Sequence, residues 1–515
     1  MEARLFFEFL QVAIGNRESL SRELSDNEWQ DIFLLIKKHA LLGVGFTAVE
    51  RLHTKGIVCP AELRIKWYAL AVHIERRNRL LNGLCKKVTE QYEHDGFSTC
   101  ILKGQGNILN YPKELGTRRQ SGDIDVWATP IKYLIHTENT EGHGCLQGDG
   151  VGERLSITDD RLFTHNIFSA VFIKLRKFLI TDGLHTENTD GYGGPQADGG
   201  IKIAVQTGKN EVEYEEYHGH KAVREYVRMQ YRLQGLNTKP KACYHHIDAP
   251  DMDGVKVEVH YRPTFCRSFV RNRRMQKWFD TLASECMSNR ISEGFSVPTA
   301  SFNVVYQMAH LFEHYFEGGI GLRHIMDYYF ALKAWQKDIM EWNSQQSQGM
   351  WSEGLGTPVM SPSQVMDVIR SFGMGKFAGA VMFVINEVFG GANENENDNE
   401  NGPRRTRRET DGGPQADFVG KQGLMNDDRL LITDCPWLLC EPNEKEGRRL
   451  LEEIMKGGNF GQYDTRDAAL KKGGMMKHGV WKLKRVMRLV RSYPEEALWE
   501  PVFRVYHLIW RMKMR

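Results

Sequence analysis

Apolar residues recur at helical spacing near the start of the chain. The runs 5–10 and 29–35 place apolar side chains on one face of a helix. Ser25, followed three residues later by Glu28, forms a capping box that begins the second run. A further helical pattern passes through 79–88. The first part of the chain is therefore predicted to consist of packed helices.

Three short segments have the pattern of strands. Residues 99–102 are a short, mostly apolar run, and residues 123–127 and 255–261 alternate polar and apolar side chains. Helical spacing returns over about 300–390 and from about 445 to the end. The pattern predicts an α+β fold with a small mixed sheet flanked by N-terminal and C-terminal helical regions. We place the helical regions at 1–96 and 266–515 and the sheet-containing core at 97–265.

Two polar segments share strings of sequence. The hexapeptide GGPQAD occurs at 193–198 and again, unchanged, at 412–417. The shared strings follow no fixed period, which argues against a solenoid, and they are too polar to build a core. We interpret them as one repeated sequence inserted into two surface loops, at about 134–215 and 391–435. The alternative is two ordinary long loops of similar composition.

The composition is typical of a globular protein with no overall attraction to nucleic acid. Apolar residues make up 41% and charged residues 26%, and 68 basic against 66 acidic residues leave a net charge of +2. Nine cysteines, an odd number without zinc-ribbon spacing, predict reduced thiols in a cytoplasmic protein. We find no convincing signal peptide and no apolar run of the roughly 18 residues that a transmembrane segment needs.

Basic and aromatic residues are interleaved from Trp481 to the C-terminus. Such a stretch could offer a weak basic surface to RNA or to a membrane. A packed helix with a solvated positive face has the same pattern. The sequence leaves both interpretations open.

Asp123 and Asp125 are the strongest candidates for chemistry. Side chains alternate along a strand, so two aspartates one residue apart point to the same side. Such a pair can hold Mg²⁺ (or Mn²⁺), which prefers hard oxygen ligands. Glu258, on another alternating segment, is the natural third carboxylate. Together they would form a two-metal site that activates an attacking oxygen and steadies a leaving pyrophosphate.

A glycine-containing turn precedes the two aspartates. Lys103 and Gly104 lie between a predicted strand and a helical turn, where backbone amides can hold phosphate and a lysine can add a charge. Arg118, Arg119 and Ser121 lie just before the aspartates and could contact a triphosphate. The simpler interpretations are a plain connection for the turn and a solvated basic pair for the arginines.

The histidines allow a rival interpretation. His310 and His314 share a helix face, with His324 nearby, and could bind a transition metal in a hydrolase. No glutamate follows His310, so the metalloprotease pattern His-Glu-x-x-His is absent. Two further histidine positions, the pair 245–246 and His260, could act as a general base or orient a substrate, or simply belong to the scaffold.

Three ordered blocks of the sequence resemble a known family. The blocks are ILKGQGNILNYPKELGTRRQSGDIDVW at 101–127, the segment 244–263 that contains VEVHYRP, and HLFEHYFEGGIGLR at 310–323 with Asp327. They are similar to an uncharacterised nucleotidyltransferase family of Bacteroides-type bacteria, within the DNA polymerase beta superfamily. The resemblance covers most of the chain outside the repeats.

The resemblance implies an enzyme that transfers a nucleoside monophosphate from an NTP to an acceptor. Asp123, Asp125 and Glu258 would be the metal ligands in the core, and the acceptor is left open among small molecules, sugars, proteins and tRNA. Two features depart from the pattern: Lys103-Gly104 stands where the superfamily usually has Gly-Ser, and an insert follows the Asp-x-Asp strand. The rival to an enzyme is a non-catalytic nucleotide-binding or scaffold protein with a degenerate fold.

Overall fold

The computed structural model describes most of the chain outside the repeat-bearing segments. The described residues are 3–131, 200–206, 212–347, 359–390, 438–471 and 473–513. The second predicted insert lies outside them, as does most of the first. The end of the first insert, within the bounds predicted above, enters a two-stranded antiparallel ribbon formed by β3 (Gly200–Gln206) and β4 (Val212–His218).

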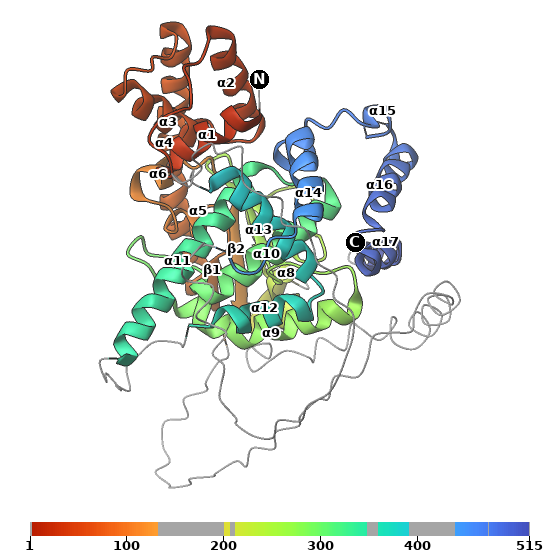
Figure 1. The fold of residues 1–515 in the computed structure, drawn as a ribbon. Coiled ribbons are helices and arrows are strands. Elements are labelled where there is room, and N and C mark those ends of the chain that lie inside the picture. Colours follow the sequence, from red (N-terminus) through yellow and green to blue (C-terminus); the bar gives the residue numbers. More distant parts are fainter. Residues whose placement is uncertain are drawn as a thin grey trace, which may run out of the picture.

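Four helices form the N-terminal region (Figure 1). They are α1 (Ala3–Ile14), α2 (Asp26–Lys38), α3 (Leu42–Thr54) and α4 (Ala61–His94). The predicted capping box is present, because the Ser25 N–H donates to Glu28 Oε2 at 2.9 Å. The long helix α4 ends at an Asp95 cap and leads directly into the sheet.

A four-stranded mixed sheet confirms the α+β prediction. Its strands, in spatial order, are β1 (Phe97–Ile101), β2 (Ile124–Pro130), β6 (Val255–His260) and β5 (His246–Met252). β2 and β6 are parallel, while both outer pairs are antiparallel. Two short helices connect β1 to β2: α5 (Gln105–Ile108) and α6 (Lys113–Arg118).

The two faces of the sheet differ in character. Val126 and Val259 point into an apolar cluster shared with α4 and α8 (Gly219–Leu233). Because side chains alternate along a strand, the residues next to Val126 on β2 and next to Val259 on β6 point to the opposite face. On that side Trp127 stacks on Phe302, with ring centroids 5.5 Å apart, so the second face meets the C-terminal helices.

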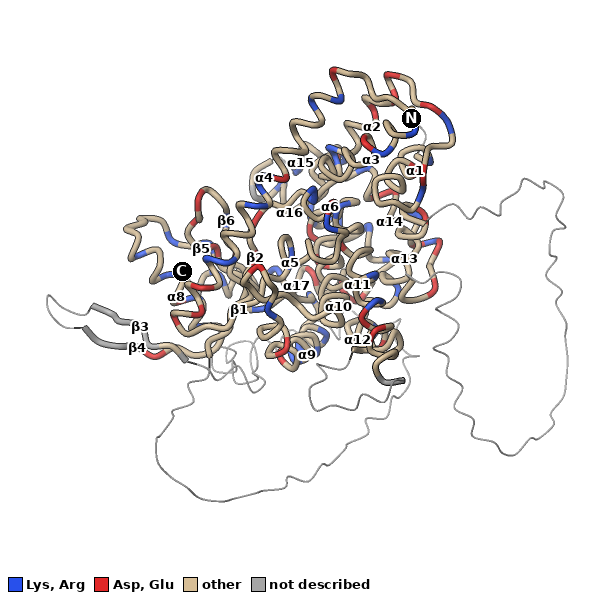
Figure 2. The backbone as a smooth tube through the Cα atoms, turned by 90° about the vertical axis from the view of Figure 1, so that its left-hand side faces the viewer, with Lys and Arg blue, Asp and Glu red and all other residues tan. Residues whose placement is uncertain are grey.

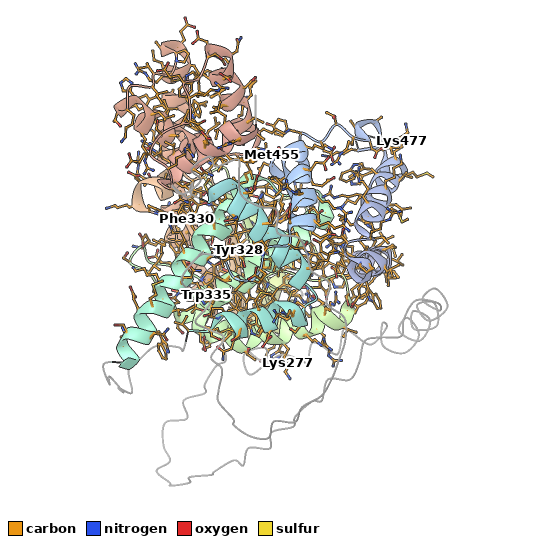
Figure 3. The ribbon with its side chains drawn as sticks, viewed as in Figure 1. Lys277, Tyr328, Phe330, Trp335, Met455 and Lys477 are labelled. Atoms are coloured by element: carbon orange, nitrogen blue, oxygen red, sulfur yellow. The ribbon has the colours of Figure 1, made fainter. Side chains whose placement is uncertain are left out.

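The C-terminal region surrounds the second face with helices (Figure 1). They are α9 (Phe269–Ser288), α10 (Ala300–Glu317), α11 (Leu322–Ser347), α12 (Pro362–Ser371), α13 (Gly375–Phe389), α14 (Glu444–Gly457), the short turns η3 (Asn459–Gly461) and α15 (Ala468–Lys471), α16 (Met475–Leu489) and α17 (Pro494–Lys513). Tyr328, Phe330 and Trp335 lie along the buried part of α11 (Figure 3). The N-terminal and C-terminal helices contribute to one continuous apolar cluster.

Charged residues of both signs are distributed along the described part of the chain (Figure 2). Figure 2 shows basic and acidic residues interspersed along the backbone, in keeping with the small net charge. Within the described part of the chain, none of the helices combines the length and the apolar character needed to cross a membrane. The seven cysteines that the structure describes are unpaired.

Candidate active site

The sheet register brings carboxylates from three strands into one row. Asp125 on β2 is the direct neighbour of Glu258 on β6, which in turn faces Asp248 on β5. Two residues further along β6, His260 pairs with His246. These side chains all lie on the face opposite the α4–α8 cluster, so the predicted meeting of Asp125 and Glu258 is present.

Asp125 is the most enclosed acid of this row. Its Oδ1 lies 3.1 Å from Lys103 Nζ and accepts a hydrogen bond from His260 Nε2 at 3.2 Å. Burial raises the pKa of the Asp125 carboxyl, but the Lys103 ammonium and the His260 imidazole outweigh burial and hold it below its usual range. Asp125 is therefore a carboxylate at neutral pH.

Asp123 occupies a more open position directly before the same strand. It lines the adjoining pocket, and its pKa is raised by partial burial and by the negative charges of Asp125 and Glu258. Ligand atoms of Asp125, Glu258 and His260 lie within 4.8 Å of one another. Among the described residues Asp123 is not part of such a compact group, so the structure joins only two of the three predicted carboxylates closely.

The turn between β1 and α5 places Lys103 next to Asp125. Gly104, the residue before α5, has φ +61°, a conformation that L side chains rarely adopt. At Gly106 an added Cβ would lie 2.1 Å from the Ile101 carbonyl oxygen, so the glycine permits close approach of helix and strand. Burial lowers the pKa of Lys103, but Asp125 and Glu258 outweigh burial and raise it. Lys103 therefore keeps its charge.

A pocket of about 670 Å³, its open mouth included, extends from these groups. Its lining includes Lys103, Gly104, Asn107, Arg119, Gly122, Asp123, Asp125, Gln307, His310, Leu311, Arg323, His324, Asp327 and Phe460. It is thus enclosed by the β1–α5 turn, the end of α6, the start of β2, α10, α11 and η3.

The two predicted phosphate-binding arginines have different surroundings. Arg119 lines the pocket, forms a two-pronged ion pair with Asp327 and donates a hydrogen bond to Ser121 Oγ at 2.8 Å. Arg118 points away: its guanidinium pairs with Glu50 on α3 and Glu75 on α4. The pocket lining contains Arg119 but neither Arg118 nor Ser121.

Arg323 is a pocket cation that the sequence motifs did not assign to the site. Its Nη1 donates to the Gln120 carbonyl oxygen at 2.8 Å, and its guanidinium carbon lies 5.5 Å from the centre of the Phe460 ring. Burial, together with the charge of Arg119, lowers the pKa of Arg323 to about 10. It remains charged at neutral pH. Its position in the GGIGLR block offered the only hint of a role.

Asn107 and Gln307 were also missed. Gln307 on α10 donates to Asn107 Oδ1 at 3.0 Å and to Asn303 Oδ1 at 3.0 Å, which ties α5 to α10 at the pocket wall. An asparagine and a glutamine on separate helices give no signal in the sequence that they will meet.

The three histidines of the hydrolase alternative lie beside the same pocket. His310 and His314 have ring centroids 4.3 Å apart, and His314 and His324 have centroids 6.1 Å apart. Burial lowers the pKa of His314 to about 4, with the Lys103 charge adding to the effect. Among the described residues these three do not form a group with ligand atoms close enough to share a metal ion.

One segment of the chain is similar to a known protein family. Residues 211–349 match the model of a family described as an uncharacterised nucleotidyltransferase. The matched segment contains Glu258, His260 and the pocket-lining parts of α10 and α11, while Lys103 and the two aspartates precede it. No curated protein and no solved structure matches the chain. The match supports nucleotidyl transfer as the general activity and confirms the family resemblance over these residues.

Proposed function

We propose that this protein transfers a nucleoside monophosphate from an NTP to an acceptor, with Asp123, Asp125 and Glu258 as its acidic centre. One observation carries the proposal: Asp125 lines a pocket that also holds Lys103 and Arg323, and Glu258 is its neighbour across parallel strands. Carboxylates able to hold a metal and cations able to hold phosphate are thus found together. This is the combination that transfer of a charged phosphoryl group needs.

The acidic centre fits the Mg²⁺ or Mn²⁺ that this activity requires. Burial and the neighbouring carboxylates of Asp125 and Glu258 raise the pKa of Asp123, and a divalent cation would stabilise its charged form. Asp125 and Glu258 would hold the ion, with Asp123 adding an oxygen from the pocket side. A bound ion would neutralise charge on the phosphates and make the acceptor hydroxyl more acidic.

The basic residues would bind the triphosphate. Lys103 is a half-buried ammonium next to Asp125 and can form a charge-assisted hydrogen bond to a phosphate oxygen. Gly104 lets the backbone of the same turn approach the triphosphate. Arg323 is fixed through Nη1, which donates to the Gln120 carbonyl oxygen. Its buried Nε has no hydrogen-bond partner among the described residues and can therefore donate to a phosphate oxygen.

Arg119 and Ser121 would hold the wall of the pocket in place rather than bind substrate. The guanidinium of Arg119 is committed to Asp327, and Ser121 accepts from Arg119. Arg118 is omitted from the proposed site because Glu50 and Glu75 hold it elsewhere.

A labelled-nucleotide assay tests the proposal. The chain and an Asp125→Asn variant are incubated with a panel of α-labelled NTPs, Mg²⁺ or Mn²⁺, and a cell lysate fractionated by size. We expect label transfer and pyrophosphate release with the unaltered chain and neither with the variant. Asp367→Asn, an exposed change on α12, is the matched control and should retain full transfer.

The same assay separates the rival function. A scaffold protein would bind a nucleotide, detected by equilibrium dialysis, without releasing pyrophosphate in any fraction. Equal transfer by the unaltered chain and by Asp125→Asn would contradict the proposed centre.

A further inference from the structure

Three imidazole rings meet next to the acidic row. His245 directly precedes β5, His246 begins β5, and His260 ends β6. Their ring centroids are separated by 4.5, 5.2 and 5.3 Å, which makes a nearly equilateral triangle. One ring nitrogen from each lies within 4.8 Å of the other two. The sheet register thus concentrates three nitrogen donors from two strands around one point.

In two of these rings, Nε2 lies next to a carboxylate. His260 Nε2 lies 3.2 Å from Asp125 Oδ1, and His246 Nε2 lies 3.5 Å from Asp248 Oδ1. A metal-binding histidine usually donates its second ring N–H to a carboxylate or carbonyl, which fixes the tautomer and the ring orientation. With Nε2 engaged in this way, Nδ1 of each ring is left for a ligand.

The remaining ring nitrogens either contact one another or lack a hydrogen-bond partner among the described residues. His246 Nδ1 lies 3.0 Å from His245 Nε2. His260 is 1% exposed, and its Nδ1 has no hydrogen-bond partner in the part of the chain that the structure describes. Buried polar atoms are nearly always paired, so this nitrogen is available to a ligand.

We propose that His245, His246 and His260 form a binding site for a divalent transition-metal ion, of the class to which Zn²⁺ and Co²⁺ belong. Three imidazoles suit borderline-soft ions, whereas Mg²⁺ prefers oxygen. The nearby carboxylates of Asp125, Asp248 and Glu258 favour a cation at this place. The ion would join the start of β5 to the end of β6 and keep a fourth position for water or an acceptor atom. This site does not depend on the proposed transfer activity.

Metal stoichiometry tests the site without nucleotide. The chain is stripped with a chelator, dialysed against Co²⁺ or Zn²⁺ in millimolar Mg²⁺, and analysed by elemental analysis and visible absorption. We expect about one ion per chain, a tetrahedral Co²⁺ spectrum and a higher melting temperature with Zn²⁺. His245→Asn and His246→Asn should each lose the ion, the spectrum and the shift in melting temperature.

His310→Asn is the matched control, because it removes a half-buried histidine from the other histidine group. It should keep the ion. The proposal is overturned if the unaltered chain binds no ion above Mg²⁺ competition. Full binding by both His245→Asn and His246→Asn, or loss of the ion in His310→Asn, would also overturn it. Circular dichroism identifies a variant that fails to fold. If one of His245→Asn and His246→Asn fails in this way, ion binding is compared between the other variant and the unaltered chain.

Discussion

Arg119 and Asp327 face each other in the wall of the pocket and form two parallel hydrogen bonds, Nε to Oδ1 at 2.6 Å and Nη2 to Oδ2 at 2.7 Å. Both side chains are buried, and Tyr111 donates to the same Oδ1 at 2.6 Å. The pair ties the end of α6 to α11, two elements far apart in the sequence. A charge that loses its partner in such a place is costly.

Removing the Asp327 charge should therefore destabilise the protein. Asp327→Asn leaves the Arg119 guanidinium buried and uncompensated, and we expect a loss of about 3–5 kcal/mol in unfolding free energy, measured by denaturant titration. The control is Asp367→Asn, whose partner Arg370 is 62% exposed and whose own side chain is 74% exposed. It should change stability by less than about 1 kcal/mol. Similar values for both variants would contradict the buried-charge argument.

The asparagine variants of Asp123 and Asp125 should both lose activity but should differ in their melting temperatures. Asp123→Asn and Asp125→Asn each remove a charged ligand at nearly constant volume, so both should abolish metal-dependent transfer. Asp125→Asn should also lower the melting temperature, because the half-buried Lys103 loses its counter-ion. Asp123→Asn removes a charge repelled by its neighbours and should leave the melting temperature unchanged or higher. Normal transfer by Asp123→Asn would exclude it from the centre.

Glu258 should matter as much as the aspartates. Glu258→Gln keeps the shape of the side chain but removes the charge beside Asp125, and we expect pyrophosphate release to fall at least 100-fold, a loss of about 2.7 kcal/mol in transition-state stabilisation. Asp248→Asn is the matched control in the same row, one strand further away. If Asp248→Asn were the more damaging change, the third carboxylate would be Asp248 instead.

His39 should make the fold sensitive to mild acid. Its ring is buried, its Nδ1 accepts from the Leu322 N–H at 3.3 Å, and burial lowers its pKa to about 3. Between that value and the ordinary pKa near 6.5, the unfolded chain binds a proton that the folded chain does not, so stability falls as pH falls. From pH 7.5 to 5.5 this one residue should cost about 1.4 kcal/mol of unfolding free energy.

His39→Asn tests the assignment, because the asparagine amide oxygen can replace Nδ1 as acceptor. Denaturant titrations at both pH values should show a smaller acid-induced loss in the variant than in the unaltered chain. Other buried histidines contribute equally to both proteins and cancel in the difference. An identical loss in both would show that His39 is not the titrating group.

The local elements were largely accessible from the sequence. Alternation at 123–127 and 255–261 predicted the strands now seen as β2 and β6, and with them the face that carries Asp125 and Glu258. The Ser25–Glu28 capping box marked the start of α2. Such signals are short-range, because they depend on side chains that meet within a few residues along one element.

One strand of the four-stranded sheet was missed for an identifiable reason. β5 reads HIDAPDM, a polar segment with Pro250 in its interior, and its register shifts between Ala249 and Met252. A proline is tolerated because β5 lies at the edge of the sheet, where one side of the backbone needs no partner. Edge position is a property of the assembled sheet, so the segment alone did not reveal it.

The sequence by itself determined which residues carry charge and which face of each strand they occupy, and tertiary structure decided which of them meet. Arg118 and Arg119 are adjacent and chemically identical, and the same role was predicted for both. The end of α6 directs Arg118 to Glu50 and Glu75 and Arg119 to Asp327 at the pocket. Likewise, only the parallel pairing of β2 with β6 places Glu258 beside Asp125. These choices depend on long-range burial and on charge partners from distant helices, which no local pattern records.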